Sequence, residues 1–222
     1  VTEDTARQES FVKIASDVVQ VWAGAFNTFY KKADGSLWGA GYNRYGQLGR
    51  STTNEFSDGA VPIVYASTNT PVRDVKQVAV GGAHVLFLLE DGRLYATGLN
   101  SSGQLGIGNK EDKTQLTFVM DGVSCVAAGD YHSAVIKSDG TVWTFGDNAY
   151  GQLGDGTTTD RLVAVQVVAL GAKAFDIAAG YGHTVVMLHN MSLWGAGLNH
   201  HGQLGLGDTI NRLAFTKAVD LE

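Results

Sequence analysis

The stretch Gly129–Gly156, GDYHSAVIKSDGTVWTFGDNAYGQLGDG, contains every part of a motif that recurs through this chain of 222 residues. It includes the tetrapeptide GQLG, which occurs four times, at Gly46–Gly49, Gly103–Gly106, Gly151–Gly154 and Gly202–Gly205. Successive copies are offset by 57, 48 and 51 residues. Self-similarity at such a period indicates a repeat architecture, in which each repeat is one supersecondary unit.

Two further markers keep the same spacing. An aromatic residue followed by a glycine precedes each GQLG, and these residues are Trp38, Tyr95, Trp143 and Trp194. A glycine also stands three residues before an asparagine or histidine, at Gly24/Asn27, Gly81/His84, Gly129/His132 and Gly180/His183. Both markers have offsets of 57, 48 and 51 residues, so chance similarity is excluded.

Each repeat has the pattern of short β-strands. Val75–Val80, His84–Leu89 and Arg93–Thr97 are β-rich runs separated by turn signals. Asp-Gly pairs such as Asp34-Gly35 predict tight hairpin turns with positive φ angles, and Asn190-Met191 is a weaker turn in the fourth repeat. A fourth strand is expected after each GQLG, at Val61–Tyr65, Leu116–Val119, Leu162–Val167 and Ala214–Ala218. Four strands per repeat predict an all-β propeller with four blades.

The quoted segment resembles the repeat of the regulator of chromosome condensation family, RCC1, and the resemblance runs from about Phe11 to the end. It implies a propeller of seven blades, which needs roughly 350 residues at this period. We expect one RCC1-like domain over residues 1–222, with repeats at about 11–65, 66–119, 120–167 and 168–218. Phe11–Ile14 has the pattern of a last strand, like Phe215–Ala218. Three arrangements remain: a piece of a longer propeller, a partial ring completed by another copy, or a small closed ring.

The composition excludes several classes of function. With 44% hydrophobic and 17% charged residues the chain should fold. No apolar run approaches the roughly 18 residues of a membrane span, and no leader precedes the repeats, so we expect no membrane partner. The single cysteine, Cys125, excludes an internal disulfide framework and a cysteine-built zinc site. A net charge of −6 without any basic run disfavours nucleic acid.

Strand direction places two loops of every repeat on one face. The Gly-x-x-His loop and the GQLG loop then lie together, and the Asp-Gly turn lies at the opposite end. The variable positions of the paired loops are rich in tyrosine and other residues that anchor protein interfaces. We therefore predict that a protein partner binds this face through Phe26, Arg44, Tyr45, Ser102, Tyr131, Tyr150, Tyr181, His200 and His201.

The recurring histidines His84, His132 and His183 invite a metal or catalytic interpretation, but a structural one is favoured. Copies around a ring are too dispersed to share a metal, and Asn27 can form the same hydrogen bonds to nearby backbone. Adjacent histidines such as His200 and His201 point apart on an extended loop. The sequence thus predicts no catalytic residues, no metal and no cofactor.

Two functions from different classes follow. The residues favour a non-enzymatic module that binds a protein partner, and the resemblance implies a guanine-nucleotide exchange factor for a Ran-like small GTPase. Such a factor deforms its partner's nucleotide site, for which the long connection Arg50–Asp74 is the candidate wedge. A plant ultraviolet receptor of this family uses tryptophans in the Gly-x-x-His loop, and this chain has none there. Unsealed blade edges also predict self-association, because exposed apolar flanks are rarely tolerated.

Overall fold

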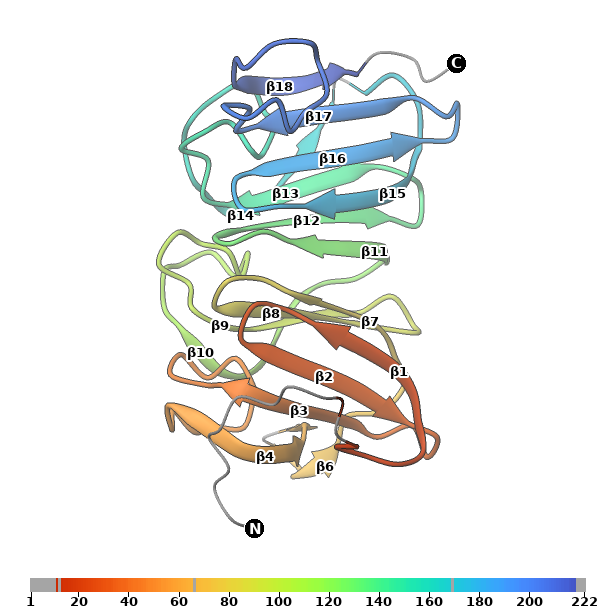
Figure 1. The fold of residues 1–222 in the computed structure, drawn as a ribbon, viewed down its shortest axis with the longest axis vertical. Helices are drawn as coiled ribbons and strands as arrows, with labels where there is room; N and C mark the ends of the chain where they lie inside the picture. The colour runs from red at the N-terminus through yellow and green to blue at the C-terminus, as the bar shows by residue number, and fades with distance from the viewer. Residues whose placement is uncertain (1–10, 12, 66, 169, 219–222) are drawn as a thin grey trace.

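Short β-rich runs separated by glycine turns form strands along the whole described chain (Figure 1). The computed structural model describes residues 11, 13–65, 67–168 and 170–218. Within these ranges every regular element is a strand, and no helix there could cross a membrane. The all-β prediction is confirmed.

Four antiparallel sheets of four strands form four blades, and each sheet follows the order of the sequence. Blade 1 contains β1 (Val18–Ala23), β2 (Asn27–Lys32), β3 (Leu37–Tyr42) and β4 (Phe56–Pro62). Blade 2 contains β7 (Val75–Val80), β8 (His84–Leu89), β9 (Leu94–Gly98) and β10 (Lys113–Met120). Blade 3 contains β11 (Val123–Ala128), β12 (His132–Lys137), β13 (Val142–Gly146) and β14 (Arg161–Val167). Blade 4 contains β15 (Ala174–Ala179), β16 (His183–Leu188), β17 (Leu193–Gly197) and β18 (Arg212–Lys217).

The blades form an open arc. Strands β1 and β2 meet β7, β7 and β8 meet β11, and β11 and β12 meet β15, so contacts run between blades that are neighbours in sequence. Blade 1 and blade 4 lie at opposite ends of the molecule (Figure 1). The described chain is therefore a partial propeller, and the small closed ring is wrong.

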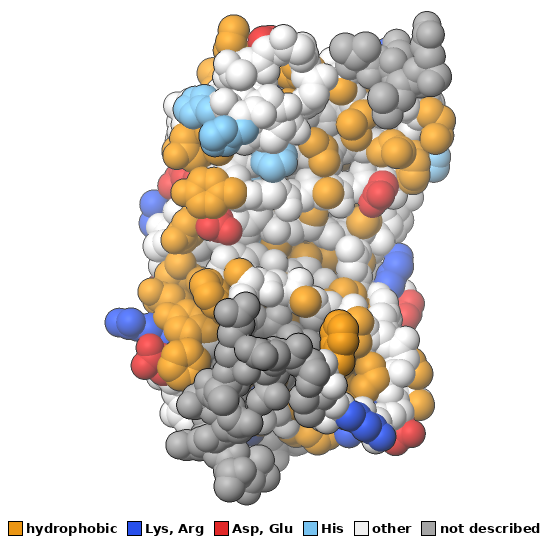
Figure 2. Space-filling view, viewed as in Figure 1, with side chains coloured by type: hydrophobic (Ala, Val, Ile, Leu, Met, Phe, Trp, Pro, Cys, Tyr) orange, Lys and Arg blue, Asp and Glu red, His pale blue; other side chains and the backbone are white. Residues whose placement is uncertain are grey.

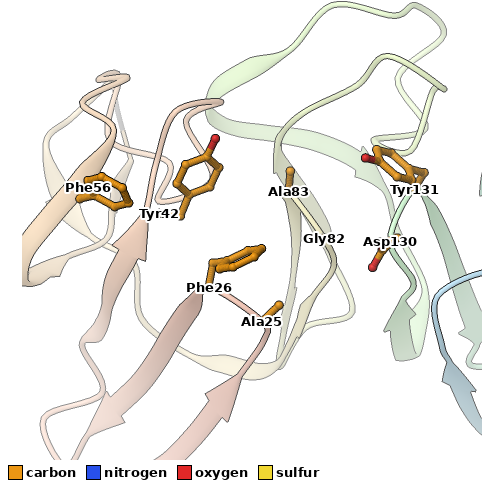
Figure 3. Close-up of a pocket in the computed structure, with 8 residues that line it drawn as sticks. All are labelled: Ala25, Phe26, Tyr42, Phe56, Gly82, Ala83, Asp130 and Tyr131. Carbon is orange, nitrogen blue, oxygen red and sulfur yellow. The ribbon is translucent and has the colours of Figure 1, made fainter. Parts of the chain in front are cut away.

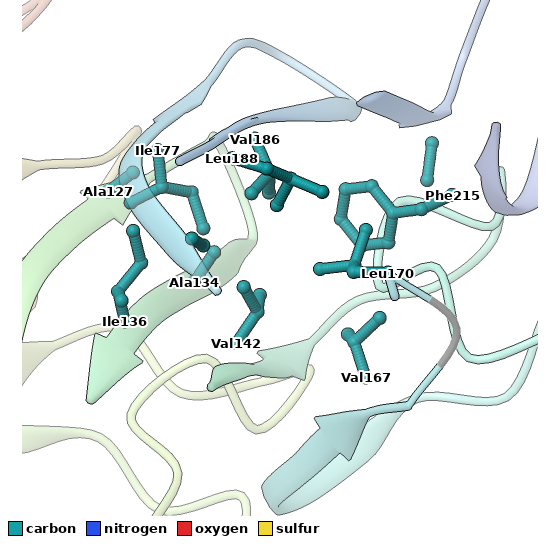
Figure 4. Close-up of a cluster of buried hydrophobic side chains, with 12 residues drawn as sticks. Ala127, Ala134, Ile136, Val142, Val167, Leu170, Ile177, Val186, Leu188 and Phe215 are labelled. Carbon is teal, nitrogen blue, oxygen red and sulfur yellow. The ribbon is translucent and has the colours of Figure 1, made fainter. Parts of the chain in front are cut away.

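The hydrophobic core is divided among the three blade interfaces. One apolar cluster joins blades 1 and 2, where Phe29 and Phe87 make an edge-to-face contact with ring centroids 5.5 Å apart. A second cluster, which includes Leu86, Val126 and Phe145, joins blades 2 and 3. The third joins blades 3 and 4 and includes Ile177 and Phe215 (Figure 4). Because each blade buries its faces against its neighbours, the position of every loop depends on blade packing.

The first repeat differs from the sequence prediction. Its fourth strand is β4, Phe56–Pro62, whereas Val61–Tyr65 was expected to form it. The chain instead continues into a two-stranded hairpin of β5 (Val64–Tyr65) and β6 (Thr70–Pro71). Ile63 N–H donates to the Leu37 carbonyl, which places this hairpin at the Asp-Gly end of the blade.

Two other expectations are corrected. The described residues of Phe11–Ile14 form no strand, and residue 12 lies outside the described ranges. In the Asp-Gly turns only the glycine has positive φ, as Gly35 shows at 84°. The Gly35 N–H donates to the Lys32 carbonyl, and the Lys32 N–H donates to the Ser36 carbonyl. This is a three-residue loop closed by a glycine bulge, and Met191 holds the glycine's place in blade 4 with φ of 63°.

Candidate functional site

Each GQLG loop is held in shape by an asparagine and a glutamine. In blade 1, Asn43 Oδ1 accepts a hydrogen bond from the Leu48 N–H at 2.9 Å, and Gln47 Oε1 accepts one from the Tyr45 N–H at 3.0 Å. The asparagine bond recurs in the other blades at Asn100, Asn148 and Asn199. Sequence reasoning missed these asparagines, although each stands three residues before a GQLG and keeps the repeat spacing.

The first glycine of GQLG lets the loop rest on the outer strand of the next blade. A Cβ on Gly46 would lie 2.5 Å from Thr114 Cα, and a Cβ on Gly151 would lie 2.6 Å from Leu213 Cα. Both glycines also have positive φ. At Gly202, in blade 4, the nearest atom would be 3.9 Å away. The loops of blades 1 to 3 therefore clamp a following blade, and the flank of blade 4 is uncovered in the described structure.

Two of the recurring histidines link one blade to the next. His84 Nε2 lies 2.9 Å from Ser133 Oγ, and that hydroxyl donates to the Gln104 carbonyl at 2.8 Å. His132 Nε2 lies 2.8 Å from Thr184 Oγ1, which donates to the Gln152 carbonyl at 2.8 Å. Since each hydroxyl proton goes to a carbonyl, each Nε2 must carry the proton that the hydroxyl accepts. We call this arrangement the histidine relay.

Burial controls the charge of the relay. It lowers the pKa of His84 to about 4 and that of His132 to about 3. Both imidazoles are therefore neutral near pH 7. Burial also lowers the pKa of His183, which is half-buried on the flank of blade 4. The hydroxyl groups of the next blade, which the side chains of His84 and His132 contact, were not part of the sequence prediction.

The two predicted loop sets share one face, along the left edge in Figure 2. Of the predicted partner-binding residues, three large apolar ones are exposed: Phe26 by 67%, Tyr131 by 43% and Tyr181 by 59%. Arg44, His200 and His201 are exposed as well, whereas Tyr45, Ser102 and Tyr150 are half-buried. The described residues contain no group of three or more His, Cys, Asp or Glu side chains that could hold a metal.

The half-buried tyrosines also pack within the protein. Tyr45 makes an edge-to-face contact with Tyr42, with ring centroids 6.2 Å apart. The ring of Tyr150 lies against Gly182, where a Cβ would be only 3.0 Å from it. Part of each side chain therefore supports the loops, and the exposed trio of Phe26, Tyr131 and Tyr181 is better placed to contact a partner.

This face contains an open cleft of about 640 Å³ between the loops of blades 1, 2 and 3 (Figure 3). It brings together two predicted residues, Phe26 and Tyr131, and the others lie outside its lining. Sequence reasoning did not select its other large or charged members, which are Tyr42, Phe56 and Asp130. Tyr42 and Phe56 are paired across β3 and β4, so they belong to no recurring loop motif.

Models of the regulator of chromosome condensation (RCC1) repeat match residues 34–88, 91–136 and 139–187, which is more than half of the chain. A second RCC1 repeat model matches residues 75–104 and 123–152. The chain is 33% identical over 202 residues to the ultraviolet-B receptor UVR8 of Arabidopsis thaliana, and covers 45% of that protein. It is 42% identical over 201 residues to the X-linked retinitis pigmentosa GTPase regulator of Canis lupus familiaris, of which it covers 20%. These alignments take in 88% and 89% of this chain.

Solved structures show the same fold at lower sequence identity. Prp20p from Saccharomyces cerevisiae superimposes with a TM-score of 0.78 at 21% identity, over 96% of this chain and 52% of Prp20p. Human WBSCR16 gives a TM-score of 0.83 at 21% identity, over 100% of this chain and 59% of that one. The chain thus spans about half the length of these propellers, and less of the GTPase regulator.

Proposed function

This chain belongs to the RCC1 repeat family, and from that premise we propose that it is a non-enzymatic module that docks a protein partner on its loop face. The observation that carries the proposal is the exposure of Phe26, Tyr131 and Tyr181 on one face, beside a cleft that Phe26 and Tyr131 line. Large aromatic side chains in such a setting are the usual anchors of protein interfaces.

The opposite face has a different character. Its turns carry ion pairs and charge–aromatic contacts, such as Arg93 with Asp91 at 2.7 Å and the Lys32 ammonium 4.2 Å above the Trp38 ring. These charged groups are satisfied locally and remain in contact with water. The contrast between the faces supports docking on the loop face.

A direct test measures capture of a partner from extract of the source organism. The variant Phe26→Ala/Tyr131→Ala/Tyr181→Ala should lose the captured protein, since truncated anchors each cost about 2 kcal/mol or more. A matched control, Phe118→Ala/Val163→Ala/Leu213→Ala, removes exposed apolar side chains from outer strands. Equal capture by wild type and the loop-face variant, with both folded, would refute the proposal.

The second candidate function is nucleotide exchange on a Ran-like small GTPase. Its support is the likeness to proteins whose names include a GTPase regulator and a Ras guanine nucleotide exchange factor from Dictyostelium discoideum. The latter is 44% identical over 154 residues, although the chain covers only 9% of it. Release of labelled GDP from a panel of Ran-like GTPases is the test, and acceleration without hydrolysis would favour this function.

The candidate wedge for such an exchange reaction, Arg50–Asp74, has parts on both faces. Phe56 lies at the loop face, whereas the β5–β6 hairpin lies at the Asp-Gly end. Tyr65 of that hairpin packs edge-to-face on Tyr95 of blade 2, with centroids 6.1 Å apart. A GTPase that used the hairpin would therefore bind the face opposite the aromatic loops. Deletion of residues 66–69 should then abolish acceleration of GDP release and leave partner capture by the loop face unchanged.

We also propose self-association, with blade 4 of one copy against blade 1 of the next. His183 lies on the flank of blade 4 without a described blade beyond it, and Thr28 holds in blade 1 the position of Ser133 and Thr184. Such a contact would extend the histidine relay between copies. Light scattering should show species above 23.5 kDa that Thr28→Val reduces, and a clean monomer at micromolar concentration would refute it.

A further inference from the structure

The cleft on the loop face exists because the loop of blade 2 is smaller than its neighbours. The two variable positions of the Gly-x-x-His loop hold Gly82 and Ala83 in blade 2. The equivalent second positions hold Phe26 in blade 1 and Tyr131 in blade 3. Two aromatic walls therefore stand on either side of a low floor, as Figure 3 shows.

One wall is an assembled aromatic platform. The ring of Tyr42 lies 6.0 Å from that of Phe26 and 5.9 Å from that of Phe56, centroid to centroid, and both contacts are tilted. Phe26 and Phe56 are nonetheless 67% and 60% exposed. The platform thus holds its shape through internal contacts and still presents ring surface to an occupant.

The other wall adds a carboxylate without a cationic partner. Asp130 lines the cleft beside Tyr131, and no ion pair to its side chain is formed by the residues that the structure describes. Its carboxyl carbon lies over Gly82, where a Cβ would be 3.2 Å away. Burial raises the pKa of Asp130, because partial removal from water disfavours the charged carboxylate.

We propose that this cleft binds an arginine or lysine side chain of a basic peptide segment in the protein partner, with the alkyl stem on the aromatic walls and the cationic head at Asp130. The inference rests on the proposed function and specifies the chemistry of the partner. Aromatic rings attract cations through their faces, and a neighbouring carboxylate adds charge complementarity.

Other occupants fit the same walls less well. An acidic segment would meet Asp130 and a chain of net charge −6, which repel it. A purely apolar side chain would bury the carboxylate further and leave it unpaired. No Lys or Arg lines the cleft, so the cation must come from the occupant.

The probe for this site is the pentapeptide Gly-Ser-Arg-Ser-Gly with blocked ends, titrated into the isotope-labelled chain and followed by amide chemical shifts. Lysine, norleucine and glutamate versions are the matched ligands. The arginine and lysine peptides should shift amides at Gly82, Ala83 and Tyr131, and bind about tenfold or more tightly than the norleucine peptide. Equal affinity for the norleucine or glutamate peptide would overturn the proposal.

Two protein variants sharpen the test. Asp130→Asn should weaken the arginine peptide by about tenfold, whereas Asp121→Asn, the same charge change at an exposed site outside the cleft, should not. Ala83→Tyr should block the cleft without unfolding the blade, because blade 3 carries Tyr131 at that position. Wild-type binding by Asp130→Asn would also overturn the proposal.

Partner capture then separates this inference from the proposed function. If Asp130→Asn and Ala83→Tyr capture the partner normally while the Phe26/Tyr131/Tyr181 alanine variant does not, the loop face is the docking site and the cationic anchor is wrong. If all three folded variants capture the partner normally, the proposed docking face itself is wrong. Loss of capture in all three supports both.

Discussion

The interface between blades 1 and 2 differs in chemistry from the interfaces between blades 2 and 3 and between blades 3 and 4. At the first, Val85 is fully buried where blades 3 and 4 carry Ser133 and Thr184, and Asn27 donates to the Tyr42 carbonyl of its own blade at 2.7 Å. The contact depends on the apolar cluster around Phe29 and Phe87. The interfaces 2–3 and 3–4 each add a buried histidine relay.

This difference shows that blades of the same repeat can be joined by two kinds of interface, one apolar and one that adds hydrogen bonds. The buried cluster of the apolar interface contains no group that titrates near neutral pH, so the stability of this interface should hardly depend on pH. At the relay interfaces, protonation of an imidazole would place a positive charge away from water, which burial disfavours. Each kind of interface therefore leads to a separate prediction, and the largest loss of stability is expected from a substitution in the apolar interface.

The substitution Phe87→Ala should destabilise the protein by about 3–5 kcal/mol, because it removes a fully buried ring and leaves a cavity against Phe29. Val135→Ala, at the equivalent position of blade 3, removes fewer buried atoms and should cost less. Urea unfolding at pH 7.5 measures both. A smaller loss for Phe87→Ala than for Val135→Ala would contradict the assignment of the first interface to aromatic packing.

Acid should weaken the relay interfaces and leave the apolar interface largely unaffected. The native pKa values of His84 and His132 lie below the ordinary value of 6.5, so the unfolded chain binds more protons as the pH falls below 6.5. Stability is therefore complete above pH 6.5 and declines toward about pH 4 and about pH 3, by about 1.4 kcal/mol per pH unit for each histidine.

The measurement is urea unfolding between pH 7.5 and 5. His84→Asn and His132→Asn should each flatten the slope, since asparagine stands at the equivalent place in blade 1 and does not titrate. Both variants should already be less stable than wild type at pH 7.5. The test is therefore the slope of the free energy of unfolding against pH below pH 6.5. An unchanged slope would show that these imidazoles are not buried neutral groups.

These interfaces also show how far the sequence alone predicts the structure. The equal offsets of GQLG, aromatic and Gly-x-x-His markers predicted the blades and the shared loop face, because glycines such as Gly46 and Gly103 are required where a loop touches the next blade. The fourth strand of blade 1 was misplaced, since the long connection around Pro62 keeps no repeat spacing.

The relay and the cleft were not predictable in the same way. Ser133 and Thr184 are one repeat away from their histidines, and the sequence contains no signal for the register between adjacent blades. The cleft depends on a size difference among the loops of three blades, with Gly82 and Ala83 lying between larger residues. Features made within one repeat were therefore predicted better than features made between repeats.

Removal of one relay hydroxyl should have a moderate effect. Thr184→Val leaves the His132 N–H and the Gln152 carbonyl buried without their partner, which should cost about 1–3 kcal/mol. Thr28→Val is the matched control at a protein concentration where light scattering shows only the monomer, because Thr28 holds the same position in blade 1 and no preceding blade is described beside it. Urea unfolding at pH 7.5 should separate the two, and equal losses would contradict the relay.

The smallest effect is expected when the relay is transplanted to the first interface. Val85→Thr supplies the hydroxyl with nearly the same shape, and Asn27→His supplies the imidazole. The hydroxyl needs an acceptor, and the Gln47 carbonyl holds in blade 1 the place of Gln104 and Gln152. Each single change should be mildly destabilising, since Val85→Thr adds an unpaired buried hydroxyl and Asn27→His loses the bond to Tyr42.

The two changes together should recover part of those losses through a favourable coupling of about 0.5–1.5 kcal/mol, the net value of a buried hydrogen bond. The double variant should also acquire the additional acid sensitivity below pH 6.5 that the single variant Val85→Thr lacks. A double-mutant cycle in urea at pH 7.5 and pH 5.5 measures both quantities. Strict additivity at both pH values would mean that Asn27 and Val85 do not face each other as His84 and Ser133 do, and that the first interface differs in blade register as well as in chemistry.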